Sequence, residues 1–268
     1  YVDDTVLDAY FKAVLGQSIQ VDARSKQDLS IVYTPLFGSG YLPVSQLLAL
    51  EGFELLQPVA KQALPNGNFP GLSAPNPESS SALDLGIRQA KETQADIVIG
   101  TDPDSDRLGA AVLHKGEYIL LTGNQIGAIL VFCLLQDRKA RGLLHQKSTV
   151  ISTVVTSDLG LAIAKSFGVH TLRTLTGFKF IGEQINLFEQ MGSYTFVFGY
   201  EESYGYLAGD YARDKDAIVA AMLLCQAAAQ CKAKSKTLVD LLVDIYAKYG
   251  YYADALDPIT LKGLDGAA

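Results

Sequence analysis

The chain contains the segment Ile97-Val98-Ile99-Gly100-Thr101-Asp102-Pro103-Asp104-Ser105-Asp106-Arg107, in which a short apolar run precedes three carboxylates at alternating positions. A short apolar run bounded by turn-forming residues is typical of a buried strand. Residues two apart in extended or tightly looped backbone project to the same side. We therefore expect Asp102, Asp104 and Asp106 to converge at the end of a buried strand, where α/β sheets place their chemistry.

Three converged carboxylates repel one another unless a cation lies among them, and their hard oxygen ligands suit Mg²⁺ or Ca²⁺. Arg107 follows directly and offers a fixed positive charge that could hold a phosphate beside the metal. An EF-hand is disfavoured, because it requires Gly and Glu where this chain has Arg107 and Leu113. The structural alternative is a solvated acidic turn, since Asp and Pro are common turn formers.

The composition is that of a globular protein. The 268 residues suffice for one large domain or two of ordinary size, and 49% hydrophobic with 19% charged residues argues against disorder. A net charge of −7 leaves no basic surface for nucleic acid. The sequence shows no signal peptide and no run of membrane-spanning length, so we expect no membrane partner. Cys133, Cys225 and Cys231 have apolar neighbours and no C-x-x-C spacing, which favours buried free thiols in the reducing cytoplasm.

Short apolar runs alternate with helical periodicity along the chain, which predicts an α/β fold. The expected strands are 29–33, 96–100, 108–113, 117–121, 149–155, 170–175 and 195–198. The expected helices are 6–14, 43–50, 81–92, 125–137, 159–167, 180–189, 216–231 and a last one ending before Gly250, and residues 57–81 are expected to form a long loop. We predict two consecutive α/β domains with mixed sheets flanked by helices, 1–121 and 122–260, and a linker beginning at 261–268.

Three further segments carry polar residues suited to a ligand. Leu175-Thr176-Gly177-Phe178-Lys179 could bind an anion or a hydroxyl at a helix start, although a simple Thr N-cap explains it equally well. In Gly199–Tyr206, the adjacent Glu201 and Glu202 would bind hydrogen-bond donors such as sugar hydroxyls if buried, or would form a solvated hairpin if exposed. Arg213–Asp216 could present a cation, but capping of the following helix is the favoured interpretation there.

Together these segments resemble the α-D-phosphohexomutase family of phosphoglucomutases and phosphomannomutases, over essentially the whole chain and in the same order. The similar segments are Thr34–Gly40 ("TPLHGVG" in the family, with Phe37 in place of His), Pro75–Glu78 ("PNPE"), Asp102–Arg107 ("DGDGDR", with Pro103 and Ser105 in place of Gly), Thr176–Lys179 ("TGxK") and Tyr200–Ser203 ("GEES", with Tyr200 in place of Gly).

The resemblance implies a mutase that moves a phosphoryl group between the 1- and 6-hydroxyls of a hexose by way of a phosphoserine. The implied substrates are glucose 1-phosphate and glucose 6-phosphate, with glucose 1,6-bisphosphate as intermediate. The implied roles are Mg²⁺ binding for Asp102, Asp104 and Asp106, phosphate contact for Arg107, proton transfer for Lys215, and sugar binding for Thr176, Gly177, Lys179, Glu201 and Ser203. The "GEES" form favours glucose over mannose, whose mutases carry "GEMSGH".

Two segments of the family have no match in this sequence: the "TASHNP"-like loop with the phosphoserine, in the family's domain I, and the "RxSGTEP"-like phosphate-binding loop of domain IV. We therefore expect the chain to correspond to domains II and III, with domains I and IV of the same protein as its partners. We expect it to bind metal weakly and to be inactive alone. Phosphomannomutase specificity and a non-catalytic sugar-phosphate-binding or regulatory module are the alternatives, and a phosphatase of another α/β family is a distant third.

Overall fold

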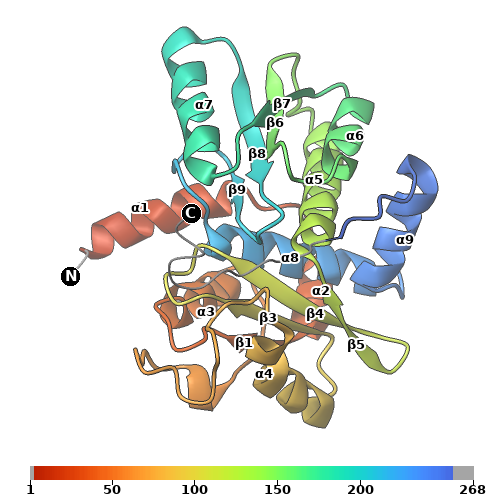
Figure 1. Ribbon diagram of the computed structural model, residues 1–268. Coiled ribbons are helices and arrows are strands. Elements are labelled where there is room, and N and C mark those ends of the chain that lie inside the picture. The colour runs from red at the N-terminus through yellow and green to blue at the C-terminus, as the bar shows by residue number, and fades with distance from the viewer. Residues whose placement is uncertain (1–2, 256–268) are drawn as a thin grey trace, which may run out of the picture.

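Two β-sheets, each with helices on both faces, build the part of the chain that the computed structural model describes, residues 3–255 (Figure 1). The first sheet has the strand order β2-β1-β3-β4-β5, in which β2, β1 and β3 are parallel and β4 and β5 are antiparallel. Its strands are β1 (Ser30–Thr34), β2 (Leu55–Pro58), β3 (Ile97–Thr101), β4 (Leu108–His114) and β5 (Glu117–Leu121).

The second sheet repeats the topology of the first without its last strand. Its order is β7-β6-β8-β9, in which β7, β6 and β8 are parallel and β9 is antiparallel. Its strands are β6 (Ser148–Thr153), β7 (His170–Thr174), β8 (Thr195–Tyr200) and β9 (Tyr206–Ala208). In both sheets, the loop after the third parallel strand leads directly into an antiparallel neighbour.

Some helices begin at a side-chain cap and others begin without one. The helical elements are α1 (Asp4–Leu15), α2 (Ala23–Asp28), α3 (Tyr41–Leu50), the 3₁₀ turn η1 (Ala60–Gln62), α4 (Ser80–Thr93), α5 (Gly123–Ala140), α6 (Leu159–Ser166), α7 (Phe178–Met191), α8 (Ala217–Lys232) and α9 (Leu238–Tyr249). Thr122 with Gln125 and Thr237 with Asp240 form capping boxes for α5 and α9.

The strand β3 is buried on both faces because its apolar residues alternate between two layers of helices. Val98 packs with Ala90 of α4 on one face, while Ile97 and Ile99 belong to the large core on the other. The second sheet is packed in the same way, with Phe178 and Ile181 of α7 covering one of its faces. The three-layer arrangement fixes where each strand ends, and so where the loops that follow the strands lie.

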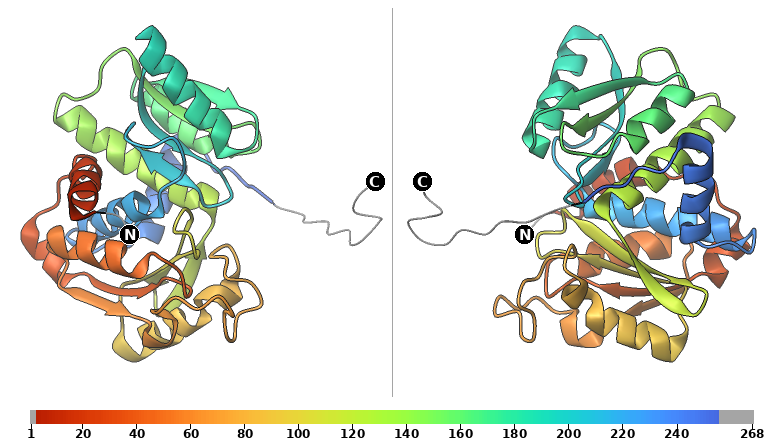
Figure 2. Two further views of the ribbon diagram at one scale, coloured as in Figure 1. Left: turned by 90° about the vertical axis from the view of Figure 1, so that its left-hand side faces the viewer. Right: turned by 45° about the vertical axis from the view of Figure 1, so that its right-hand side comes forward.

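Helix α8 lies between the two sheets (Figures 1 and 2). It contacts β3, β4 and α3 of the first half and α5 and β9 of the second. Its alanine-rich sequence leaves nearly every residue buried, including Ala220, Ala221 and Ala227. Helix α8 lies after residue 121, in the predicted second domain, but it packs against β3 and β4 of the first sheet. The division of the chain at residue 121 stays a prediction.

The fold class expected from the sequence is confirmed, with local corrections. The expected loop over 57–81 is wrong at its start, because β2 extends to Pro58 and η1 follows it. Helix α2 and strand β9 were not predicted; both are too short to show a periodic pattern. Cys133, Cys225 and Cys231 are buried and unpaired, as expected. The predicted linker, 261–268, lies outside the described residues. Within 3–255, no helix combines the length and apolar character needed to cross a membrane.

Candidate active site

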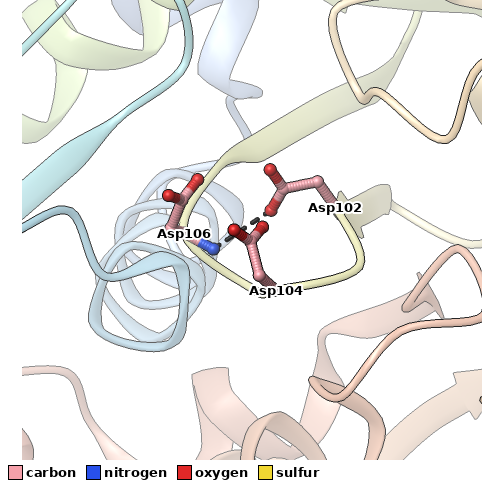
Figure 3. A group of neighbouring side chains, drawn as sticks. All are labelled: Asp102, Asp104 and Asp106. Atoms are coloured by element: carbon pink, nitrogen blue, oxygen red, sulfur yellow. Dashed lines mark hydrogen bonds between the residues drawn. The ribbon is translucent and has the colours of Figure 1, made fainter. Parts of the chain in front are cut away.

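The loop between β3 and β4 folds around the carboxylate of Asp102. Its Oδ1 accepts hydrogen bonds from the backbone N–H groups of Asp106 and Arg107, both at 3.0 Å. Figure 3 shows Asp102, Asp104 and Asp106 side by side, with the bond from the Asp106 N–H to Asp102. Each residue offers one carboxylate oxygen, and the three oxygens lie within 4.8 Å of one another. The side chains therefore converge as the alternating spacing predicted.

The three carboxylates of this triad repel one another. Asp102 is only 8% exposed. Burial raises the pKa of Asp102 to about 7, and repulsion from Asp106 and Asp104 adds to the increase, while the backbone N–H of Arg107 opposes it. A divalent cation among the three oxygens would remove that repulsion. Three carboxylate oxygens at this spacing fit a hard cation such as Mg²⁺.

Arg107 is held by a carboxylate outside the triad. Its Nη1 lies 2.6 Å from Oε1 of Glu78, while its Nε is 3.9 Å from Oδ2 of Asp102 and 3.9 Å from Oδ1 of Asp106. The guanidinium therefore borders the triad without a hydrogen bond to it. Glu78 belongs to the "PNPE" segment, and no local pattern predicts that it pairs with Arg107.

Lys215 reaches the triad from the segment that precedes α8. Its Nζ lies 2.9 Å from Oδ2 of Asp106 and 3.4 Å from Oδ1 of Asp214. Burial favours the neutral amine, but the hydrogen bond and the attraction to Asp106 outweigh it, so the pKa of Lys215 is raised. The capping interpretation holds for the next residue, since Asp216 accepts from the N–H of Ile218 at 2.8 Å. The segment thus caps the helix and delivers a cation to the triad.

Glu201, the first residue after β8, is 5% exposed. Its Oε1 accepts a hydrogen bond from the backbone N–H of Gly177 at 2.9 Å. Burial raises the pKa of Glu201, and the Gly177 N–H partly offsets that effect. Glu202 accepts a hydrogen bond from the hydroxyl of Thr156 at 2.9 Å. A solvated hairpin with two surface acids is therefore the wrong interpretation of this segment.

The remaining residues of the expected sugar-binding set are Thr176, Gly177, Lys179 and Ser203. Gly177, with φ of 116°, is the N-cap of α7 and makes no side-chain cap bond, so the Thr N-cap interpretation is also wrong. Thr176 and Lys179 are exposed, and Nζ of Lys179 lies 5.0 Å from the ring centroid of Phe180. Ser203 is partly exposed in the same loop as Glu201.

The triad loop and the Glu201 loop are joined by backbone hydrogen bonds. Arg107 and Gly205 form an isolated antiparallel bridge, and the N–H of Leu108 donates to the carbonyl of Tyr204 at 3.0 Å. The N–H of Ala217 donates to the carbonyl of Ser105, also at 3.0 Å. Segments about one hundred residues apart in the sequence thus form one continuous surface.

A groove of about 620 Å³ opens beside the triad. Asp104, Asp106 and Lys215 line it, together with Ser39 of the "TPLHGVG"-like segment and Tyr10 of α1. Thr176, Lys179, Glu201 and Ser203 are outside its lining. The structure therefore brings Asp104, Asp106 and Lys215 together at the groove, whereas Asp102, Arg107 and the sugar-binding set lie outside its lining.

Comparison with known proteins gives one consistent result. Residues 8–116 match the description "Phosphoglucomutase/phosphomannomutase, alpha/beta/alpha domain II", and residues 122–249 match domain III of the same family. A phosphoglucomutase from Staphylococcus aureus (strain bovine RF122 / ET3-1) is 35% identical over 263 residues, which are 98% of this chain and 46% of that protein. The chain therefore spans about half the length of the curated relative that it matches.

Solved structures show the same fold. A phosphoglucomutase/phosphomannomutase family protein from Burkholderia thailandensis has a TM-score of 0.68 and 19% identity, over 90% of this chain and 46% of that one. The N-acetylphosphoglucosamine mutase of Aspergillus fumigatus, solved in complex with GlcNAc-6P and magnesium, has a TM-score of 0.59 and 14% identity. That match covers 91% of this chain and 49% of the other.

Proposed function

Because the chain belongs to the phosphoglucomutase/phosphomannomutase family, with a domain II followed by a domain III, we propose that it is the metal-binding and sugar-binding part of a phosphoglucomutase. The whole enzyme would interconvert glucose 1-phosphate and glucose 6-phosphate through glucose 1,6-bisphosphate. The observation that supports this most strongly is the Arg107–Gly205 bridge, because it joins the carboxylate triad to the loop that carries Glu201.

Asp102, Asp104 and Asp106 are the proposed ligands of Mg²⁺, the cation found with the Aspergillus fumigatus mutase. Bound there, Mg²⁺ would neutralise charge on a phosphoryl group during its transfer. Arg107 borders the same oxygens and can contact a phosphate oxygen through N–H groups that Glu78 does not use. The proposed ligands thus share one loop with a phosphate-binding cation.

Lys215 is the proposed proton-transfer group, because its ammonium lies against the triad at the edge of the groove. Glu201 and Ser203 are the proposed partners of two neighbouring sugar hydroxyls. The hydrogen bond from Gly177 to Oε1 fixes the Glu201 carboxylate and leaves its second oxygen to accept a hydroxyl. Thr176, Gly177 and Lys179 would contact the rest of the sugar, and the "GEES"-like loop favours glucose over mannose.

We also propose that the phosphoserine and the distal phosphate clamp come from domains I and IV, which this sequence does not match. The chain alone would then bind substrate without turning it over. Its proposed compartment is the cytoplasm, in keeping with three buried, unpaired cysteines. Without the phosphoserine as a further ligand, metal binding by the chain should be weak.

Titration calorimetry with Mg²⁺ and then with glucose 6-phosphate tests the proposal. Asp104 is exposed, so Asp104→Ala should abolish Mg²⁺ binding while leaving the fold intact. Asp84→Ala, which removes another exposed carboxylate, from α4, is the matched control and should bind like the wild type. Equal Mg²⁺ binding by wild type and Asp104→Ala would refute the metal assignment. Rapid conversion of glucose 1-phosphate by this chain alone would refute the proposal that it is inactive.

A further inference from the structure

The segment before α4 presents Glu78 to the triad loop. The side-chain oxygen of Asn76 accepts a hydrogen bond from the Glu78 N–H at 3.0 Å. The backbone carbonyl of Asn76 accepts one from the Ser79 N–H, also at 3.0 Å. Pro77 packs against Gly109 at the start of β4, where an added Cβ would lie 2.6 Å from the Pro77 carbonyl oxygen. This close approach requires glycine at 109 and holds Glu78 opposite Arg107.

Glu78 and the triad face different nitrogens of one guanidinium. The Glu78 contact is short, at 2.6 Å, whereas the two contacts to Asp102 and Asp106 are both 3.9 Å. The Arg107 and Glu78 side chains are 34% and 27% exposed, so solvent screens the pair only in part.

Without Glu78, the nearest carboxylates to Arg107 would be those of the triad. A shift of the guanidinium by about one ångström would bring Nε of Arg107 within hydrogen-bond distance of the carboxylate oxygens that now lie 3.9 Å away. It would then occupy oxygens that a divalent cation needs. Removal of Glu78 would also leave the positive charge of Arg107 uncompensated beside the cation site.

We propose that Glu78 is a positioning residue, which holds Arg107 back from the triad so that the three carboxylates stay open to a divalent cation. The inference rests on the proposed function, since it takes the triad as a metal site. Glu78 is not among the proposed ligands of the metal or partners of the sugar. It acts through Arg107, and its effect should therefore disappear when Arg107 is absent.

Mn²⁺ titration of the chain, followed by electron paramagnetic resonance and by calorimetry, tests this inference. Glu78→Ala should raise the Kd for Mn²⁺ by about tenfold to a hundredfold, the usual cost of losing a residue that orients a metal site. Glu78→Gln keeps a hydrogen-bond acceptor for Arg107 and should show a smaller rise. Glu92→Ala removes an exposed carboxylate from the end of α4 and should leave the Kd unchanged. In an Arg107→Met background, Glu78→Ala should change the Kd by about twofold or less.

Thermal melts of each variant separate this role from a structural one. A lower melting temperature for Glu78→Ala with an unchanged Kd would overturn the inference, as would an equal effect in the Arg107→Met background. If Glu78→Ala does not fold, the Kd of Glu78→Gln decides in its place, and a value equal to that of the wild type counts against the inference. Absence of Mn²⁺ binding in the wild type would overturn the proposed metal site and this inference together, and so differs from a failure seen only in the variants.

Discussion

Arg107 and Gly205 pair through their backbones, and each is the residue immediately before the first antiparallel strand of its own sheet, β4 or β9. Asp102 and Glu201 are equivalent in the same way, because each is the first residue after a third parallel strand. Both are buried carboxylates that accept backbone hydrogen bonds. The two halves of the chain thus meet through corresponding loops, one with the triad and the other with Glu201.

The ion pair between Lys215 and Asp106 predicts competition between the lysine and a metal ion. Lys215→Met removes a positive charge 2.9 Å from a proposed ligand oxygen, so the affinity for Mn²⁺ should increase. We expect the affinity for Mn²⁺ to increase by about fivefold to tenfold. An unscreened Coulomb interaction at this distance would give a larger change, but solvent and salt reach the site. Lys91→Met on the surface of α4 is the control. Weaker Mn²⁺ binding by Lys215→Met would mean that the lysine organises the triad instead of competing for it.

Asp102 predicts an unusual dependence of stability on pH. Its pKa is about 7 in the folded chain, raised mainly by burial, and near its ordinary value of about 4 in the unfolded chain. Between these values the folded chain binds a proton that the unfolded chain does not, so the free energy of unfolding falls as pH rises from about 4 to about 7. The loss from this carboxyl is at most about 4 kcal/mol.

Urea unfolding at pH 5 and pH 8, with a chelator present, measures that loss. Asp102→Asn keeps the carbonyl oxygen that accepts the Asp106 and Arg107 N–H groups but removes the titration. The variant should therefore lose less stability than the wild type over this range. Added Mg²⁺ should restore the wild type at pH 8 and not the variant. An identical pH dependence for the two proteins would contradict the raised pKa of Asp102.

The strand and loop around Asp102 were predictable because their signals are local. An apolar run defines β3, and the alternating carboxylates lie within five residues of its end at Thr101, so backbone periodicity alone brings them together. The partners of the triad were not predictable from local pattern. Lys215 follows Asp106 by about one hundred residues, and it reaches the triad only because α8 packs beneath β3 and β4.

The errors in the sequence interpretation have a common physical cause. Whether Glu201 is buried or solvated depends on its contact with Gly177, which is 24 residues away. The strands β2 and β9 have four and three residues, too few for a periodic signal, and tertiary pairing defines them. Glu78 lies in a turn whose residues resemble those of any loop, and only its packing against β4 gives it a partner.

The carboxylate of Asp216 predicts a stability effect at α1. Its Oδ2 accepts hydrogen bonds from the hydroxyls of Tyr10 at 2.7 Å and Tyr211 at 2.6 Å, while its Oδ1 caps α8. Tyr10→Phe should lower the free energy of unfolding by about 1.5–3 kcal/mol, the range for hydrogen bonds to charged groups. Tyr251→Phe, at a site that is 76% exposed, should have no effect in the same urea experiment. Equal losses for both variants would show that the Asp216 contact does not hold α1 in place.

Gly127 gives a prediction in which two known effects have opposite signs. Alanine is the better helix former by about 1 kcal/mol, so Gly127→Ala in the second turn of α5 would stabilise an isolated helix. In the folded chain, however, the new Cβ would lie 2.2 Å from Cδ2 of Tyr200, a fully buried ring. Overpacking of this kind costs about 1–3 kcal/mol and should win, because the ring is also packed against Gly160 and cannot move aside.

The same substitution should weaken sugar-phosphate binding, since Tyr200 directly precedes Glu201 and a displaced ring would carry that carboxylate with it. Gly67→Ala is the matched control, because an added Cβ there meets no atom within 4 Å. Urea unfolding and calorimetric titration with glucose 6-phosphate measure the two effects. If Gly127→Ala were as stable as Gly67→Ala, helix propensity would outweigh the contact with Tyr200. If it lost stability but bound the sugar phosphate normally, Tyr200 would support the core without setting the position of Glu201.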